Sequence, residues 1–415
     1  MKRKPLILAM TGAISAGLLH GPTLAAKAAD QAQPPLGLPP VPIPADNPQT
    51  AAKIALGDKL FHDTRFSADG KVACSTCHAR EKAFTDNLTT SKGFRGLTGT
   101  RNAPTVINAA YMQSQFWDGR EPDLEGQAKQ PPINPVEGGL PNHEPILAVI
   151  RQDPDYRKRF KEVFGLKPEQ ITEDHVAKAI ASFERTVISG DSPFDRYQYG
   201  GDPKALNASQ QRGLELFRLK ARCASCHTVE HTQSLFTDNR FHNIGIGFKA
   251  IAGKEPVVAE KFLRMKHAST EPDAVAEMID KAVLSDKEIS ELGRFVITED
   301  FSDIGAFKTP TLRNVAVTFP YMHDGSLKTL SEVVDFYNNG GRVNPDDPLT
   351  PFLSGGIKPL DLSDEEKADL VAFLESLTSP QYQALVRKTS RKTAKAAVDN
   401  SNTGGHKVTA GGKNP

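Results

Sequence analysis

Two copies of one pentapeptide carry the most recognisable chemistry of the chain. Both have the spacing C-x-x-C-H, and they are Cys74-Ser75-Thr76-Cys77-His78 and Cys223-Ala224-Ser225-Cys226-His227. This spacing is typical of c-type haem attachment, in which two thiols bind the porphyrin and the His binds the iron. Alternative uses of such cysteines are a redox pair, a zinc site or disulfides. All four cysteines lie in these motifs and a His follows each pair, so we predict two covalent haem c groups.

A longer internal repeat surrounds the two motifs. Gly57 and Gly213 each begin a Gly-x-x-Leu-Phe segment ahead of a motif. After the motifs, Pro104–Asp118 and Pro310–Asp324 have equal length, begin with Pro-Thr and end in Asp followed by Gly. The repeat predicts a mainly α protein of two tandem cytochrome c-like haem domains with few short strands.

Amphipathic helices with capping residues are expected at the ends of these domains. One begins after Thr50 and one after Thr172, and a third follows Ser363, which forms a capping-box pattern with Glu366. The second copy is longer than the first between its motif and its Pro-Thr pair. Within this insert, Ser285 is predicted to cap a further helix.

Composition and sequence pattern divide the chain into five segments. We predict a signal peptide at 1–28, a Pro-rich, unpacked linker at 29–48, domains at 49–200 and 201–380, and a disordered basic tail at 381–415. A membrane anchor is the alternative for the first segment, but its apolar stretch is short and interrupted. The predicted signal peptide indicates the periplasm. The formal net charge of +1 gives no argument for nucleic-acid binding.

The repeat also suggests that the two irons differ. Pro131 and Tyr337 stand at the same distance from the Asp-Gly pair of each copy. Proline has no side-chain ligand, whereas a phenol oxygen can bind ferric haem, so an open first iron and a closed second iron are expected. The alternative is that Tyr337 is a core aromatic. Trp117 could relay electrons or belong to a core, and Gln127 and Glu137 could handle peroxide or lie in a solvated loop.

At these residues the sequence resembles the bacterial dihaem cytochrome c peroxidase and MauG superfamily. The resemblance covers about Pro48 to Ser379. Its marks, besides both C-x-x-C-H motifs, are Leu56-Gly57-x-x-Leu60-Phe61, Arg101-Asn102-Ala103-Pro104-Thr105, Phe116-Trp117-Asp118-Gly119-Arg120, Pro310-Thr311-Leu312-Arg313-Asn314 and Pro320-Tyr321-Met322-His323-Asp324-Gly325.

The resemblance implies a peroxidatic N-terminal haem and an electron-transfer C-terminal haem with Trp117 between them. Many members carry a displaceable His where this chain has Phe94, and a Met ligand where it has Tyr337. Both departures resemble MauG, whose distal Gln, Pro and Glu match Gln127, Pro131 and Glu137. The first haem is therefore expected to be open without prior reduction, unless another His such as His62 or His143 binds it.

The resemblance also implies one calcium ion between the domains. The matching oxygen donors are the Asn102 side chain and the carbonyls of Thr318 and Pro320. The expected substrate is hydrogen peroxide, and the electrons are expected from a small redox protein or an oxidisable protein substrate. The alternatives are a dihaem electron carrier without peroxidase chemistry and a sensor of diatomic gases. The sequence leaves homodimer formation open.

Overall fold

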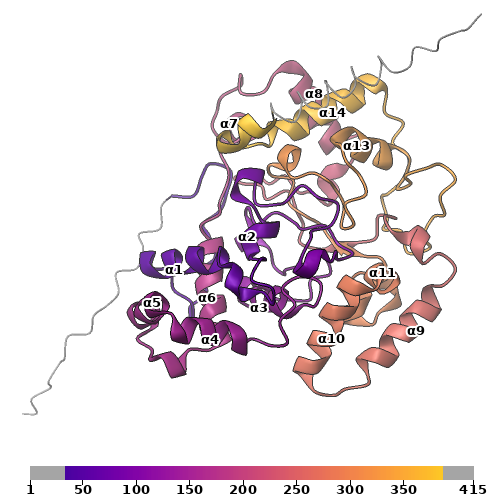
Figure 1. Cartoon of the computed structure of the whole chain (residues 1–415). Coiled ribbons are helices and arrows are strands. Elements are labelled where there is room, and N and C mark those ends of the chain that lie inside the picture. The colour runs from indigo at the N-terminus through magenta and orange to yellow at the C-terminus, as the bar shows by residue number, and fades with distance from the viewer. Residues whose placement is uncertain (1–32, 387–415) are drawn as a thin grey trace, which may run out of the picture.

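The computed structural model describes residues 33–386, and in this range the chain is mostly helical (Figure 1). Strands β1 (Phe241–His242) and β2 (Phe307–Lys308) pair antiparallel. No described helix is long and apolar enough to cross a bilayer. The helices are α1 Ala51–Phe61, α2 Cys74–Cys77, α3 Leu124–Ile133, α4 Glu144–Gln152, α5 Pro154–Phe164, α6 Glu173–Glu184, α7 Pro193–Gln198, α8 Ala208–Arg218, α9 Glu255–Lys266, α10 Pro272–Ser285, α11 Lys287–Ser290, α12 Phe295–Thr298, α13 Leu330–Asn338 and α14 Asp364–Ser376.

The predicted duplication is visible in how two helix pairs cross. In the first copy, a Cβ on Gly57 of α1 would lie 1.9 Å from the carbonyl oxygen of Ala179 on α6. In the second copy, a Cβ on Gly213 of α8 would lie 2.0 Å from the carbonyl oxygen of Asp369 on α14. Only glycine permits such close backbone approach. The glycine of each Gly-x-x-Leu-Phe segment therefore sets the packing of the two cytochrome c-like units.

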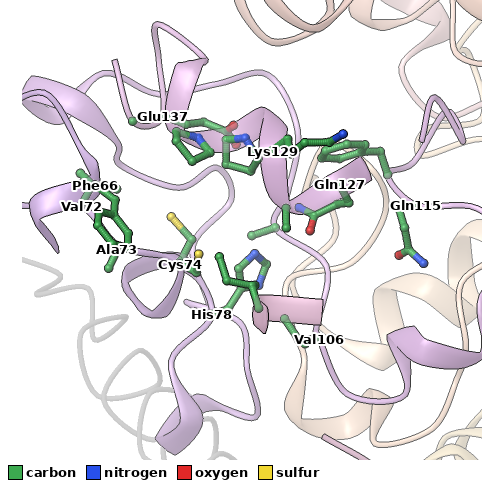
Figure 2. Close-up of a pocket in the computed structure, with 18 of the residues that line it drawn as sticks. Phe66, Val72, Ala73, Cys74, His78, Val106, Gln115, Gln127, Lys129 and Glu137 are labelled. Atoms are coloured by element: carbon green, nitrogen blue, oxygen red, sulfur yellow. The ribbon is translucent and has the colours of Figure 1, made fainter. Parts of the chain in front are cut away.

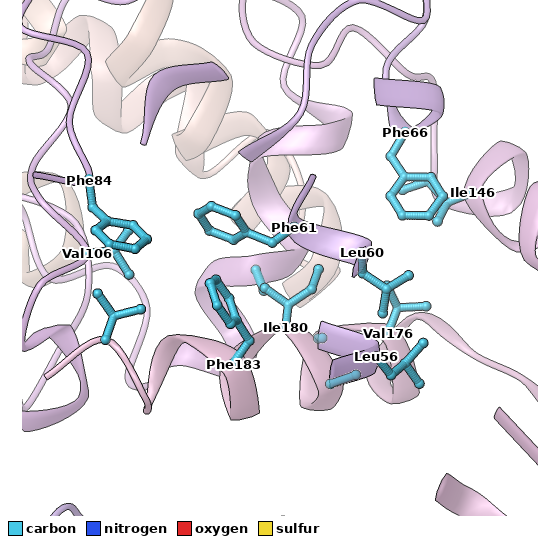
Figure 3. Close-up of a cluster of buried hydrophobic side chains, with 14 of the residues drawn as sticks. Leu56, Leu60, Phe61, Phe66, Phe84, Val106, Ile146, Val176, Ile180 and Phe183 are labelled. Carbon is cyan, nitrogen blue, oxygen red and sulfur yellow. The ribbon is translucent and has the colours of Figure 1, made fainter. Parts of the chain in front are cut away.

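Each unit has its own hydrophobic core. The first core joins α1 and α6 through Leu56, Phe61, Ile180 and Phe183, among others (Figure 3). A second core forms around α7, α8, α13 and α14. The core contacts pass from the first cluster to the second between Val187 and Phe194, ahead of the domain boundary predicted between residues 200 and 201.

The insert of the second copy forms a third core, built by α9 to α12. Here the predicted cap is wrong, because Ser285 is the last residue of α10. Asp286 instead caps the short α11 by accepting the backbone N–H groups of Glu288 and Ile289. Figure 1 shows these helices on the side of the molecule where α3 lies.

Two terminal segments are more closely packed than the sequence suggests. Residues 33–48 form no helix or strand, but Leu38 is buried and the Gly37 carbonyl accepts a hydrogen bond from Arg313 at 2.7 Å, so the expectation of an unpacked linker is wrong here. Tyr382 is buried in the first core, so the expected tail cannot begin at 381. The segment predicted as a signal peptide and residues 387–415 lie outside the described residues.

Candidate active site

The two motif histidines are oriented by the same local backbone. Nδ1 of His78 lies 3.2 Å from the Phe84 carbonyl oxygen, and Nδ1 of His227 lies 2.9 Å from that of Phe236. A ring that donates from Nδ1 keeps Nε2 available for a metal. Burial lowers the pKa of both imidazoles, which favours the neutral form that a metal requires. Both histidines therefore have the orientation and the neutral form that a metal ligand needs.

The threonines of the two Pro-Thr pairs bind the backbone beside these carbonyls. The Thr105 hydroxyl donates to the Ala83 carbonyl at 2.7 Å, and the Thr311 hydroxyl donates to the Leu235 carbonyl at the same distance. Each accepting residue directly precedes the Phe whose carbonyl holds the motif histidine. Thr105 and Thr311 thus stabilise the backbone whose carbonyls orient the two motif histidines.

A cavity beside the first motif brings together most of the residues predicted for the reactive site. Figure 2 shows His78 and Cys74 on one side and Gln127 and Glu137 across from them. Gln127 and Pro131 are four residues apart on α3, so they share one face of that helix. The predicted residues that line the cavity are Cys74, Cys77, His78, Asn102, Trp117, Gln127, Pro131 and Glu137.

Glu137 has the most unusual environment in this cavity. Its Oε2 is buried and has no hydrogen-bond partner among the described residues. Burial, together with the nearby Asp280 and against the opposing effect of Arg120, raises the pKa of the carboxyl to about 8. A buried polar atom without a partner is costly unless something else meets it. The cavity therefore fits a bound group that presents a proton or a polar atom to Glu137.

Tyr337 is the residue predicted to close the second iron site. Tyr337 lies on α13, which Thr329 and Glu332 begin with a capping box. Burial raises the pKa of the Tyr337 phenol, and the Cys223 and Cys226 thiols raise it further. The hydroxyl is thus within electrostatic range of both thiols of the second motif. Ligation of the second iron by Tyr337 stays a prediction.

Trp117 connects the two copies. Its indole N–H donates to the Asn102 carbonyl at 2.9 Å, and the Asn102 N–H donates to the His323 carbonyl at 2.7 Å. His323 takes the place of Trp117 in the second copy, stacks on Phe307 with ring centroids 3.6 Å apart, and lies 2.8 Å from Glu291. A continuous chain of short contacts therefore runs from the first cavity into the second unit.

The residues that could compete for the first iron differ in position. Phe94 packs against Gly139, where a Cβ would lie 2.5 Å from the Phe94 ring, and it does not line the cavity. His62 is also absent from the cavity lining, and its Nδ1 lies 2.8 Å from the Asp58 carbonyl oxygen. His143 does line the cavity, but its Nε2 lies 2.8 Å from the Lys129 carbonyl oxygen. Of these three side chains, only that of His143 reaches the cavity.

Sequence reasoning missed two titratable residues near the motifs. Glu184, at the end of α6, lines the first cavity, its Oε2 has no partner among the described residues, and burial raises its pKa to about 8. His242 on β1 lies 2.8 Å from Asp238, and hydrogen bonds to Cys226 and Asp238 raise its pKa to about 9. Among the His, Cys, Asp and Glu side chains of residues 33–386, Cys226, Asp238 and His242 form the one group of three whose ligand atoms lie close enough for a metal. No spacing in the sequence points to either residue.

Comparison with known proteins identifies the family. The profile of the di-haem cytochrome c peroxidase family matches residues 51–204. "Cytochrome-c peroxidase IdrP1" of Denitromonas iodatirespirans is 39% identical over 361 residues, which cover 85% of this chain and 89% of that protein. "Methylamine utilization protein MauG" of Methylorubrum extorquens is 36% identical and covers 81% of each chain.

A solved structure agrees with these relatives. The crystal structure of a MauG-like protein associated with microbial copper homeostasis is 35% identical to this chain, with a TM-score of 0.66. The match covers 85% of this chain and 95% of that one. The chain therefore belongs to the di-haem cytochrome c peroxidase family, with peroxidase-type oxidoreductase activity, two haem cofactors and hydrogen peroxide as substrate.

Proposed function

We propose that the chain reduces hydrogen peroxide in the cavity beside His78, and that a second site closed by His227 and Tyr337 shares the oxidising equivalents, as in MauG. The observation that carries this proposal is the buried carboxyl oxygen of Glu137 in that cavity, which has no hydrogen-bond partner among residues 33–386. When bound at His78 through Cys74 and Cys77, haem c would supply the iron that binds peroxide and provides the electrons for its cleavage.

The protein residues would then manage protons and orientation. The Glu137 carboxylate would accept a proton from one peroxide oxygen and return it to the other, which leaves as water. The Gln127 amide would hold the peroxide in the orientation that this transfer needs. Pro131 offers no side-chain donor or ligand, so it leaves the iron position free. With two electrons and two further protons, one peroxide yields two waters.

The second site would stabilise the oxidised protein until a donor arrives. A phenolate from Tyr337 is an anionic oxygen donor, and such donors favour ferric or more oxidised iron. Trp117 would pass electrons between the sites along its contacts with Asn102 and His323. The electrons would come from a small redox protein or from an oxidisable side chain of a protein substrate.

The expected calcium site has compatible donors. Asn102 donates its amide to the carbonyls of Leu88 at 2.9 Å and Thr89 at 3.3 Å, so its Oδ1 is the atom left for a cation. The adjoining Asn87 donates to the Phe319 carbonyl at 2.9 Å, which ties this segment to the loop that contains Thr318 and Pro320. We propose calcium there because all three donors are neutral or carbonyl oxygens. The predicted signal peptide and c-type haem support a periplasmic location.

Adding hydrogen peroxide to the diferric protein tests the proposed function. We expect an immediate change in the haem spectrum and consumption of peroxide without prior reduction. A spectrum that responds only after the second haem is reduced would contradict the open first site. No response in either state would contradict peroxidase activity itself.

A further inference from the structure

The loop that carries Glu137 is organised by one residue. Asn134 is the C-cap of α3, and its carbonyl accepts the N–H groups of Glu137 at 3.1 Å and Gly139 at 2.8 Å. Its Oδ1 also accepts the Val136 N–H at 3.0 Å. Three hydrogen bonds of the loop therefore converge on Asn134, and a shift of this residue would move Glu137.

Asn134 is in turn held by the insert of the second copy. Its Nδ2 donates to the carboxylate of Asp280 on α10 and lies 3.3 Å from the Asp280 carbonyl oxygen. Both residues are buried, with Asn134 1% and Asp280 3% exposed. The loop beside the first motif thus depends on a carboxylate that lies 146 positions further along the chain.

The same carboxylate holds an arginine of the first copy. Asp280 Oδ1 accepts from Arg120 Nη2 at 2.7 Å and from Nε at 3.0 Å. Arg120 also donates to Asp118 at 3.1 Å, and Asp118 pairs with Arg101. In a buried setting, an ion pair that loses one partner leaves a costly uncompensated charge. Asp280 therefore belongs to a buried network of ion pairs and hydrogen bonds. This network contacts the loop that carries Glu137 and also Asp118, which follows Trp117.

The charges around Glu137 come from several elements. Asp280 on α10 disfavours its ionised form, and Arg120 from the segment ahead of α3 favours it. Cys74 and Cys77 of the first motif line the same cavity, and the Glu137 charge acts on both thiols. Of these groups, Asp280 is the one that is normally anionic and touches the loop directly.

We propose that Asp280 is a positioning residue for the peroxide site, where it holds Glu137 in place through Asn134. The inference rests on the proposed function, in which Glu137 moves the peroxide proton. It assigns a role to the insert: α10 completes the first cavity, to which it also contributes Leu284. A purely structural ion pair would affect stability alone. For a positioning residue, the charge must reach Glu137, and breaking its link to the loop through Asn134 must also slow the peroxide reaction.

The test is an infrared titration of the Glu137 carboxyl in the haem-loaded protein, with the band assigned by its loss in Glu137→Gln. Asp280→Asn removes the charge and keeps an amide that can still meet Asn134. Without the nearby negative charge, the midpoint of Glu137 should fall by about one pH unit or more. Asp286→Asn is the matched control, because it removes a carboxylate from the same insert and preserves the cap of α11. In this control variant, the midpoint of Glu137 should equal that of the wild type.

A second variant keeps the test decisive if Asp280→Asn does not fold. Asn134→Ala breaks the link to the loop but leaves the charge of Asp280 and its pairing with Arg120. We expect a slower peroxide reaction, by about tenfold or more, as for other misplaced proton shuttles. An unmoved midpoint in folded Asp280→Asn, or an unchanged rate in Asn134→Ala, would overturn the inference. The titration of Glu137 does not require turnover. A protein that does not react with peroxide would therefore refute the proposed function, while the titration would still show whether Asp280 acts on Glu137.

Discussion

Replacing Glu137 by Gln should remove the proton shuttle and its signature in the pH profile. Gln keeps the size and hydrogen bonding of the side chain but cannot accept and return a proton. A positioned general acid–base contributes about 10²–10⁴-fold to rate. The wild-type pKa of about 8 means that about one carboxyl in ten is ionised at pH 7. The wild-type rate should therefore rise about tenfold per pH unit below this pKa and level off above it, while the variant stays slow and flat.

The assay is stopped-flow mixing of the diferric protein with hydrogen peroxide at a series of pH values on both sides of the Glu137 pKa. Glu121→Gln is the matched control, since Glu121 also has a raised pKa and pairs with Gln130, but it does not line the cavity. Its profile should follow that of the wild type. If Glu137→Gln retains the wild-type rate, or the same inflection, another group moves the proton and the reasoning fails.

Three further predictions concern attachment, ligation and stability. Replacing both cysteines of one motif by Ala should lower the intact mass by one haem; a mass that keeps both would contradict covalent attachment. Tyr337→Phe should raise the reduction potential of the second haem, because an anionic oxygen donor stabilises ferric iron; an unchanged potential and spectrum would show that Tyr337 only packs. For Glu184, the folded pKa of about 8 lies above the usual 4.5, so folding favours the protonated form. From pH 5 to pH 8 the wild type should lose unfolding free energy relative to Glu184→Gln, by at most roughly 1.4 kcal/mol per pH unit, in denaturant titrations; a constant difference would contradict the buried carboxyl.

Much of this architecture could be predicted because the chain contains an internal repeat, whose two copies can be compared with each other. The repeated glycines and Pro-Thr pairs fix backbone geometry, so their spacing indicated two similar units, and the structure confirms the mainly helical fold. Thr50 and Ser363 also begin helices as predicted, since a side-chain cap is a local signal. The residues expected beside the first motif do line one cavity.

What the sequence could not indicate depends on contacts between distant segments. The packing of Leu38, the hydrogen bond from Arg313 to Gly37 and the pairing of Asp280 with Arg120 join positions far apart in the chain. Ser285 was misassigned because the adjoining Asp286 is an equally good cap and α10 continues up to it. The sequence around Glu184 carries no local signal of burial, and only the folded cavity shows that this residue is buried.

Electron paramagnetic resonance of the fully oxidised protein tests the central claim most directly. An open site at His78 and a site closed by His227 and Tyr337 should give one high-spin and one low-spin ferric signal. His143 is the side chain that could close the first site by binding its iron, because it lines the first cavity. Two low-spin signals, together with no reaction on adding peroxide, would contradict the account.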